Sequence, residues 1–207
     1  MTQDGRAALG RLTKRELPRS MMSVLSTPGK YVQGPDAIHE IGKYMAELGK
    51  RAFLVGGPTA LSATRPAIEA GLQSAGVELA GVAKFGGWTT LPEIERLATA
   101  AEAVDADVVI GAGGGKALDA ARGTAITTST ALAQVPTLAS TDAPCAGLSA
   151  IYNERHENVS GLFRSSGPDL VLVDTRIILN SPVRYTVSGM GDAVSTTYEA
   201  EACAACG

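Results

Sequence analysis

Hydrophobic residues along the chain follow two alternating patterns, short β-rich runs and longer stretches with a helical period. Residues 35–48 and 91–104 space their apolar side chains three and four positions apart, so that one face of each helix would pack on a sheet. Strands that alternate with such helices predict an α/β fold, in which helices flank a parallel sheet. Strands are expected at residues 52–55, 77–83, 107–110 and 170–173, and helices at residues 35–48, 91–104, 116–127 and 190–205.

The two ends of the chain depart from this alternation. Residues 1–22 carry several basic side chains but have neither a helical period nor the apolar segment of a secretory signal, so we expect a flexible extension. An equally good alternative is that the natural protein begins at Met21 or Met22 and that the preceding segment has no structural role. Near the other end, Pro182 followed by Gly189-Met190-Gly191 predicts a hinge, after which an Ala-rich helix begins a second, helical domain.

Composition excludes several classes of partner. The chain has 207 residues, 45% of them hydrophobic, enough for one sizeable core or for one domain with the first part of another. A formal net charge of −3 provides no basic surface for nucleic acid or an anionic membrane, and no apolar run is long enough to cross a bilayer. Three cysteines cannot form a disulfide framework, which favours a reducing cytoplasm.

The strongest chemical signal is the segment VVIGAGGGK at residues 108–116, where an apolar strand runs into three consecutive glycines and then into a helix. Glycine lets the backbone turn sharply and approach a pyrophosphate, whose charge the free N–H groups of the helix would stabilise. Neither familiar nucleotide motif fits, because a dinucleotide fingerprint needs glycine in place of Lys116 and a P-loop needs glycine in place of Ile110. A turn that only joins strand to helix is the alternative, and the chain entropy of three glycines argues against it.

A second segment of interest is PTLASTDAPC at residues 136–145. Prolines and small hydroxyl residues after a strand predict a rigid polar loop, here with the carboxylate of Asp142 in its middle. Turns of the Asx and Ser/Thr types form such loops for purely structural reasons. The pattern alone therefore leaves a binding role and a structural role open.

Asp192 is a candidate metal ligand, expected in the first turn of a helix. The helix dipole alone favours a carboxylate there, and a metal site would need further ligands. The two histidines offer no paired spacing: His39 is expected on a solvent-facing helix surface and His156 at the tip of a hairpin. Cys203 and Cys206 lie in the Ala-rich helical run without a second pair, so we expect core or interface cysteines.

Taken in order, six segments resemble the glycerol dehydrogenases of the iron-containing alcohol dehydrogenase family. They are PGKY at residues 28–31, FGG at 85–87, GGGKALD at 113–119, STDAP at 140–144, VLVDT at 171–175 and SGMGDA at 188–193. The likeness runs from Pro28 to Ala204, and STDAP separates the glycerol dehydrogenases from their butanol and propanediol relatives.

The resemblance implies a Rossmann-like, nucleotide-binding α/β domain over residues 23–181. Residues 182–207 would then form the first helix of an incomplete all-α domain that binds a metal. The implied reaction is the oxidation of glycerol to dihydroxyacetone with NAD, assisted by a divalent metal, with zinc as the expected ion. The resemblance further implies a homo-oligomer in the full-length form and agrees with a cytoplasmic location.

Carried over residue by residue, the resemblance assigns three roles. Asp142 would hold a hydroxyl of glycerol, and Asp192 would be the first metal ligand. The metal would act as a Lewis acid that lowers the pKa of the bound hydroxyl. The dinucleotide would contact Gly113, Gly114, Gly115, Lys116, Asp119, Thr137, Leu138, Ala139, Ser140, Leu148 and Tyr152.

Three departures from the family pattern limit what the resemblance implies. Gly56-Gly57-Pro58 stands where the family has an acidic residue for the adenosine ribose, so NADP stays open as the cofactor. Trp88 stands where an acidic residue is common in the family. The family's two metal-binding histidines would lie beyond residue 207, so these residues alone are expected to be inactive.

Two other functions stay open. One is a catalytically inactive nucleotide-binding module that works by association, which metal content and turnover would distinguish from an enzyme. The other is an enzyme of the glycerol-1-phosphate dehydrogenase or dehydroquinate synthase type, which shares the fold and the glycine loop. The STDAP segment at residues 140–144 argues against it, and a panel of substrates would decide.

Overall fold

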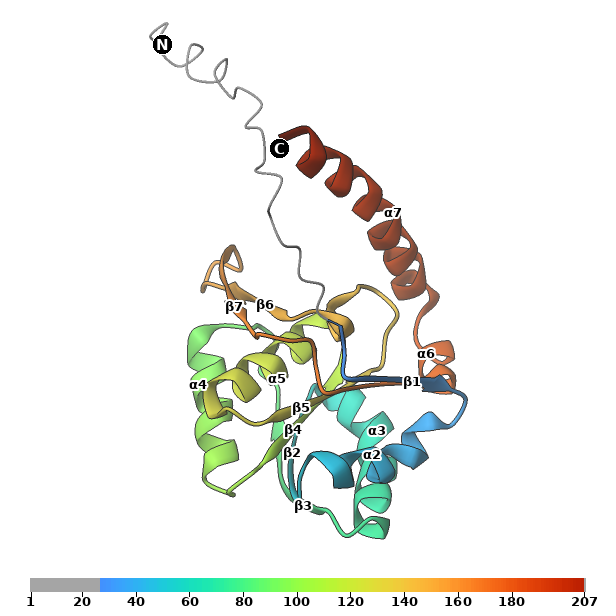
Figure 1. The fold of residues 1–207 in the computed structure, drawn as a ribbon, viewed down its shortest axis with the longest axis vertical. Coiled ribbons are helices and arrows are strands. Elements are labelled where there is room, and N and C mark those ends of the chain that lie inside the picture. The colour runs from blue at the N-terminus through green and yellow to red at the C-terminus, as the bar shows by residue number, and fades with distance from the viewer. Residues whose placement is uncertain (1–26, 207) are drawn as a thin grey trace, which may run out of the picture.

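Six parallel strands form the central sheet of the protein. A computed structural model describes residues 27–206, and the expected extension at residues 1–22 lies outside them. The strands stand in the order β1-β8-β5-β4-β2-β3, and all neighbours are parallel. Their bounds are β1 (Lys30–Gly34), β2 (Arg51–Gly56), β3 (Glu78–Lys84), β4 (Val108–Gly113), β5 (Ala131–Pro136) and β8 (Leu170–Asp174). The α/β fold predicted from the hydrophobic pattern is confirmed (Figure 1).

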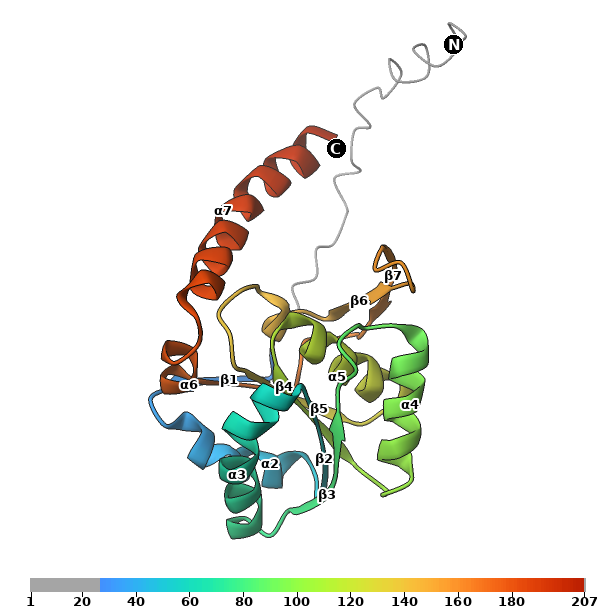
Figure 2. The ribbon, with the colours of Figure 1, turned by 180° about the vertical axis from the view of Figure 1, so that it is seen from behind.

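Helices cover both faces of the sheet because successive strand residues point to opposite sides. Leu54 and Ile110 pack in one buried cluster with α2 and α3, whereas Phe53 and Val109, their neighbours in β2 and β4, pack in the other with α4 and α5. Figure 2 shows the two helix pairs on opposite sides of the strands. The helices are α2 (Ile41–Leu48), α3 (Pro58–Ser74), α4 (Leu91–Glu102) and α5 (Gly115–Thr128).

The helix expected at residues 35–48 has a different beginning. Asp36 adopts the left-handed conformation with φ of 60°, and a 3-10 helix, η2 (Ala37–Glu40), leads into α2. The buried carboxylate of Asp174 holds this turn, since it accepts hydrogen bonds from the backbone N–H groups of Asp36 and Ile38 at 3.3 and 3.1 Å. The apolar period located the helical face correctly but not this capped turn.

An antiparallel hairpin stands apart from the sheet and consists of β6 (Leu148–Tyr152) and β7 (Asn158–Phe163). Its tip contains His156, as the sequence predicts, in the left-handed conformation with φ of 63°. The side-chain oxygen of Asn153 accepts hydrogen bonds from two backbone N–H groups of the tip at 2.9 and 3.0 Å. The hairpin therefore carries His156 on an ordered turn.

Two expectations about the C-terminal helix are wrong. After the short helix α6 (Thr175–Leu179), α7 spans Val183–Cys206, so it begins directly after Pro182 and not near Met190. The glycines expected to form a hinge lie inside the helix, and Asp192 is not in its first turn. Proline is compatible with a helix start because the first N–H groups need no helical partner.

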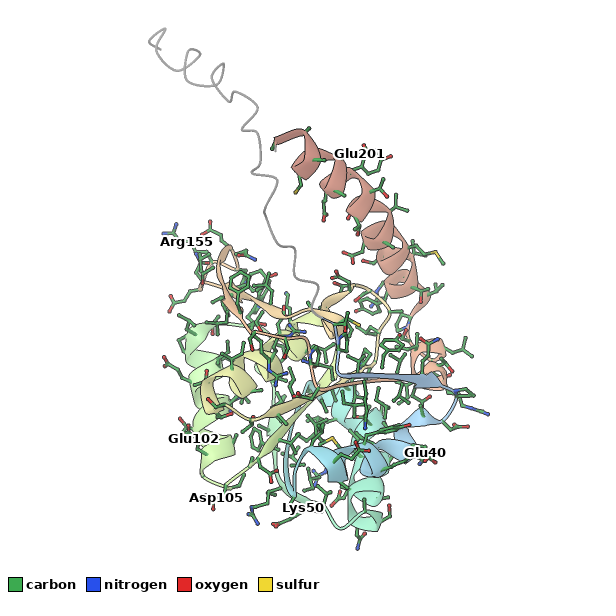
Figure 3. The ribbon with its side chains drawn as sticks, in the orientation of Figure 1. Glu40, Lys50, Glu102, Asp105, Arg155 and Glu201 are labelled. Atoms are coloured by element: carbon green, nitrogen blue, oxygen red, sulfur yellow. The ribbon has the colours of Figure 1, made fainter. Side chains whose placement is uncertain are left out.

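None of the described residues of α7 is buried, and the helix extends away from the sheet (Figures 1 and 2). Figure 3 shows Glu201 on its distal half, remote from the strands. Cys203 and Cys206 are exposed, which excludes a core position for them in this chain. Among the residues that the structure describes, no helix is both long and apolar enough to cross a membrane.

Candidate functional site

The carboxyl ends of β2 and β4 define the candidate site. From β2 the chain continues to β3 at the sheet edge, whereas from β4 it continues to β5 on the other side, so the connections diverge between these neighbours. Open α/β sheets bind ligands at such a divergence, outside the carboxyl ends of the strands. The glycine loop, Gly113 to Lys116, lies there because it follows β4. Lys50 and Asp105 precede β2 and β4, and so mark the opposite, amino ends of these strands (Figure 3).

The glycine loop has the geometry of an anion cradle. Gly113 has φ of 150°, which residues with a side chain rarely adopt, and a Cβ there would lie 2.9 Å from the Cβ of Ala117. Gly114 caps α5 without a side-chain acceptor, so no side chain occupies the first N–H groups of the helix, of which that of Ala117 donates to the carbonyl of Gly114 at 3.0 Å. Their partial positive charge favours an anion. The strand-to-glycine-to-helix arrangement predicted from the sequence is present, and the ligand itself stays a prediction.

The polar loop, residues 137–145, packs directly on the glycine loop. A Cβ at Gly114 would lie 2.8 Å from the side chain of Leu138, and a Cβ at Gly115 would lie 3.1 Å from the side chain of Thr141. The glycines therefore also allow the two loops to approach each other. Four predicted dinucleotide contacts line the first half of the polar loop and are buried or partly buried: Thr137, Leu138, Ala139 and Ser140.

A buried arginine that the sequence analysis missed connects three segments. The side chain of Arg122 in α5 is fully buried and forms an ion pair with Asp119. The same guanidinium donates hydrogen bonds to the carbonyl oxygens of Leu148 in β6, at 2.7 Å, and of Ala143 in the polar loop. Arg122 thus fixes the backbone on both sides of the site.

Asp119, a predicted dinucleotide contact, is only 8% exposed. Burial raises the pKa of its carboxyl group, and the charge of Arg122 opposes that rise. Burial likewise lowers the pKa of Arg122, with Asp119 opposing that shift. The structure therefore shows Asp119 supporting Arg122, and a contact with the dinucleotide stays a prediction. The spacing of Asp119 and Arg122, three residues apart on one helix, is the sequence signal that would have identified the pair.

Lys116 lies beside an aromatic cluster at the mouth of the glycine loop. Its Nζ is 3.0 Å from the ring centroid of Trp88 and 5.9 Å from that of Tyr152, and burial lowers its pKa. Trp88 and Tyr152 meet edge to face, with centroids 5.3 Å apart. The end of β6 and the loop after β3 therefore converge on Lys116. The sequence predicted a common role for Lys116 and Tyr152 as dinucleotide contacts, but it did not predict that Trp88 lies beside them.

The two aspartates with predicted functional roles, Asp142 and Asp192, also come together. The backbone N–H of Asp142 donates a hydrogen bond to a side-chain oxygen of Asp192 at 3.2 Å, across 50 residues of sequence. Gly189, one helical turn before Asp192, permits this approach, since a Cβ there would lie 2.2 Å from the carbonyl oxygen of Ala139. Asp142 is exposed, and its carboxylate forms no ion pair with another described residue.

The residues present do not form a complete metal site. Within residues 27–206, no group of three or more His, Cys, Asp or Glu side chains is placed to hold a metal ion. His39 is exposed on η2, and His156 stacks on Trp88 with ring centroids 3.8 Å apart. Divalent metals in catalytic sites need about three protein ligands. Asp192 can supply one of these ligands, and one ligand alone is not enough to hold a metal ion.

Known proteins resemble the chain in sequence. Residues 28–175 match the family described as iron-containing alcohol dehydrogenase. The glycerol dehydrogenase of Escherichia coli O6:H1 (strain CFT073) is 38% identical over 187 residues, which cover 90% of this chain and 51% of that protein. The glycolaldehyde reductase of Halobacterium salinarum is 39% identical over 187 residues, again 90% of this chain and 51% of that protein.

A solved structure resembles the chain in fold. The crystal structure of a probable glycerol dehydrogenase from Sinorhizobium meliloti 1021 superposes with a TM-score of 0.78 and 33% sequence identity. The superposition covers 86% of this chain and 48% of that one. The chain therefore spans about half the length of the relatives it matches.

Proposed function

This chain belongs to the iron-containing alcohol dehydrogenase family, and we propose that it binds NAD in its glycine loop as part of the oxidation of glycerol to dihydroxyacetone. The observation that carries the proposal is the meeting of three segments beside the carboxyl ends of β4 and β5: the glycine loop, the polar loop with Asp142, and α7 with Asp192. The similarity to glycerol dehydrogenases supports this substrate.

The glycine loop fits a dinucleotide because its glycines have no side chains of their own and no side chain caps the helix that follows. Its backbone N–H groups and the ammonium of Lys116 would neutralise the pyrophosphate. The dinucleotide, when bound, supplies the acceptor for the hydride that leaves the alcohol carbon. Leu148 and Tyr152 in β6 would flank it, and Arg122 holds the carbonyl of Leu148 in place.

We propose a divalent metal, with zinc as the expected ion, as the second cofactor. Asp192 would provide one oxygen ligand beside the polar loop, where its carboxylate already accepts the hydrogen bond from Asp142. The further ligands that such an ion requires are not found among residues 27–206. No step of the reaction is therefore assigned to it.

Asp142 would orient glycerol through its exposed carboxylate, which can accept a hydrogen bond from a hydroxyl of the substrate. In an active form that has the full length of the relatives, we expect Asp142→Asn to lower kcat/KM for glycerol by about 5- to 150-fold. This range corresponds to about 1–3 kcal/mol for a hydrogen bond to a charged group. Steady-state kinetics with glycerol measure the effect.

Asp105→Asn is a matched control because it removes one carboxylate at the amino ends of the strands, on the side of the sheet away from the site (Figure 3). Asp105 has φ of 48°, a conformation that asparagine also adopts readily. Its kinetics should stay unchanged. Equal kcat/KM values for Asp142→Asn and the unmodified enzyme would refute the assignment of Asp142 to the substrate.

Cofactor choice should depend on Gly57, which follows β2 and caps α3. No carboxylate stands there to repel a 2′-phosphate, so we expect weak discrimination between NAD and NADP. Nothing lies within 4 Å of a Cβ at Gly57, so Gly57→Asp should fold normally. We expect it to raise the ratio of the NADP to the NAD dissociation constant by about tenfold or more.

Calorimetric titration of the chain with each dinucleotide tests both the proposed function and this dependence. Gly57→Asn is the matched control, since it has the same shape without the charge. Absence of NAD binding to the unmodified chain would overturn the proposed function. Strict NAD preference that Gly57→Asp leaves unchanged would show that another group sets the choice.

The identity of the substrate requires a panel that includes glycerol, glycolaldehyde and glycerol 1-phosphate. Glycolaldehyde belongs in it because the relative at 39% identity is a glycolaldehyde reductase. A clear preference for glycerol 1-phosphate would contradict the proposal and favour the phosphate-specific branch. A full-length form that binds NAD but turns over none of these substrates would support the inactive-module alternative.

A further inference from the structure

Both faces of the Trp88 indole are occupied. The Nζ of Lys116 lies 3.0 Å from the centroid on one side, and the imidazole of His156 stacks nearly parallel, at 3.8 Å and 6° between planes. An ammonium and a ring at these distances cannot share one face without overlapping, so Lys116 and His156 lie on opposite faces. The indole is therefore sandwiched between the glycine loop and the tip of the hairpin.

The loop that carries Trp88 is fixed at several points. The hydroxyl of the buried Thr89 donates to the carbonyl of Lys116 at 2.8 Å, and the carbonyl of Thr89 accepts from the N–H of Tyr152 at 2.9 Å. The carboxylate of Glu93 accepts a hydrogen bond from the N–H of Gly86 at 2.8 Å. The position of Trp88 relative to the start of α5 is thus set by its own neighbours.

We propose that Trp88 is a positioning residue for Lys116, which holds the ammonium beside the glycine loop before the anionic ligand arrives. The inference rests on the proposed function, because it takes the ligand of that loop to be a dinucleotide. A free lysine stem loses rotamer entropy when its ammonium is fixed on a phosphate. A cation–π contact already restricts the lysine stem in the free protein, so less rotamer entropy is lost when the ligand binds.

His156 completes the arrangement from the other side. Its stacking on the far face limits the rotation of the indole, and Tyr152 contacts the indole edge to face. Stacked and edge-to-face rings attract each other beyond the area they bury. The hairpin tip, which the sequence analysis left without a function, thereby contributes to the site through Trp88.

The expected result is weaker NAD binding when the aromatic face is removed. Trp88→Leu should raise the dissociation constant of NAD by about 2- to 30-fold, the range spanned by exposed and desolvated cation–π contacts. Trp88→Phe, which keeps an aromatic face, should recover at least half of the loss on a logarithmic scale. Isothermal titration calorimetry of the 207-residue chain with NAD measures both, and thermal unfolding checks that the variants are folded.

A double-mutant cycle distinguishes positioning from a general structural role. If Trp88 acts through Lys116, Trp88→Leu should have no further effect in a Lys116→Met background. Lys43→Met is the matched control, because Lys43 also approaches an aromatic ring, that of Tyr44 at 5.6 Å, but lies on α2. It should leave NAD affinity unchanged.

Each other outcome has a definite meaning. Additive effects of Trp88→Leu and Lys116→Met would overturn the inference, as would equal losses for Trp88→Leu and Trp88→Phe. Tighter NAD binding by Trp88→Leu would also overturn it, by showing that the indole withholds Lys116 from the ligand. These results presuppose that the unmodified chain binds NAD, and lack of that binding would overturn the proposed function instead.

Discussion

A polypeptide of these 207 residues should show no glycerol-dependent reduction of NAD, even where it binds the dinucleotide. A catalytic zinc site needs about three protein ligands and one open position. Within residues 27–206, no three metal-binding side chains meet, and Asp192 is the one candidate ligand that the family resemblance indicates. One carboxylate beside the polar loop cannot hold a divalent ion against water. The expected activity is therefore at the background level of the assay.

Two measurements on the same purified sample test this prediction. Absorbance of NADH reports turnover with glycerol and added zinc, and elemental analysis after dialysis reports the bound metal. The E. coli glycerol dehydrogenase, which is 38% identical, serves as the positive control under the same conditions. Stoichiometric zinc together with steady turnover of the 207-residue chain would contradict the ligand count.

The sequence predicted those parts of the fold that local pattern determines. Residues 52–55 and 108–110, within two of the predicted strands, are apolar throughout because helices cover both faces of the sheet, and such runs are distinctive. The glycine loop was recognisable because its backbone requires residues without a side chain, as the φ of Gly113 and the close approach of Leu138 to Gly114 show. In both cases the physical requirement falls on consecutive residues.

What the sequence did not predict depends on contacts between distant segments. The role of Arg122 arises only when β6 and the polar loop are placed beside α5, which no local pattern specifies. The strand β5 and the helix α3 were also missed; Pro66 inside α3 obscures its helical period. Trp88 was noticed only as a departure, because its partners Lys116 and His156 lie on other elements.

The start of α7 was wrong for a related reason. Gly189 and Gly191 resemble a hinge when read along the chain, since glycine weakens a helix. In the structure both lie inside α7, and they differ in their surroundings. A Cβ at Gly189 would lie 2.2 Å from the carbonyl oxygen of Ala139, whereas a Cβ at Gly191 would have nothing within 4 Å. Only Gly189 is required where the helix meets the polar loop.

Gly189→Ala should therefore detach α7 from the polar loop, although alanine strengthens helices. The backbone of Ala139 cannot yield as a flexible side chain would, and such overpacking costs about 1–3 kcal/mol. The hydrogen bond from the Asp142 N–H to Asp192 should open, with that amide exchanging its hydrogen about 5- to 150-fold faster by nuclear magnetic resonance. Gly191→Ala gains the same helix propensity without the clash, so its Asp142 amide should exchange no faster than in the unmodified chain. If both variants behaved alike, the contact at Gly189 would not be what holds Asp192 beside Asp142, and the hydrogen bond between the Asp142 N–H and the Asp192 carboxylate would need another cause.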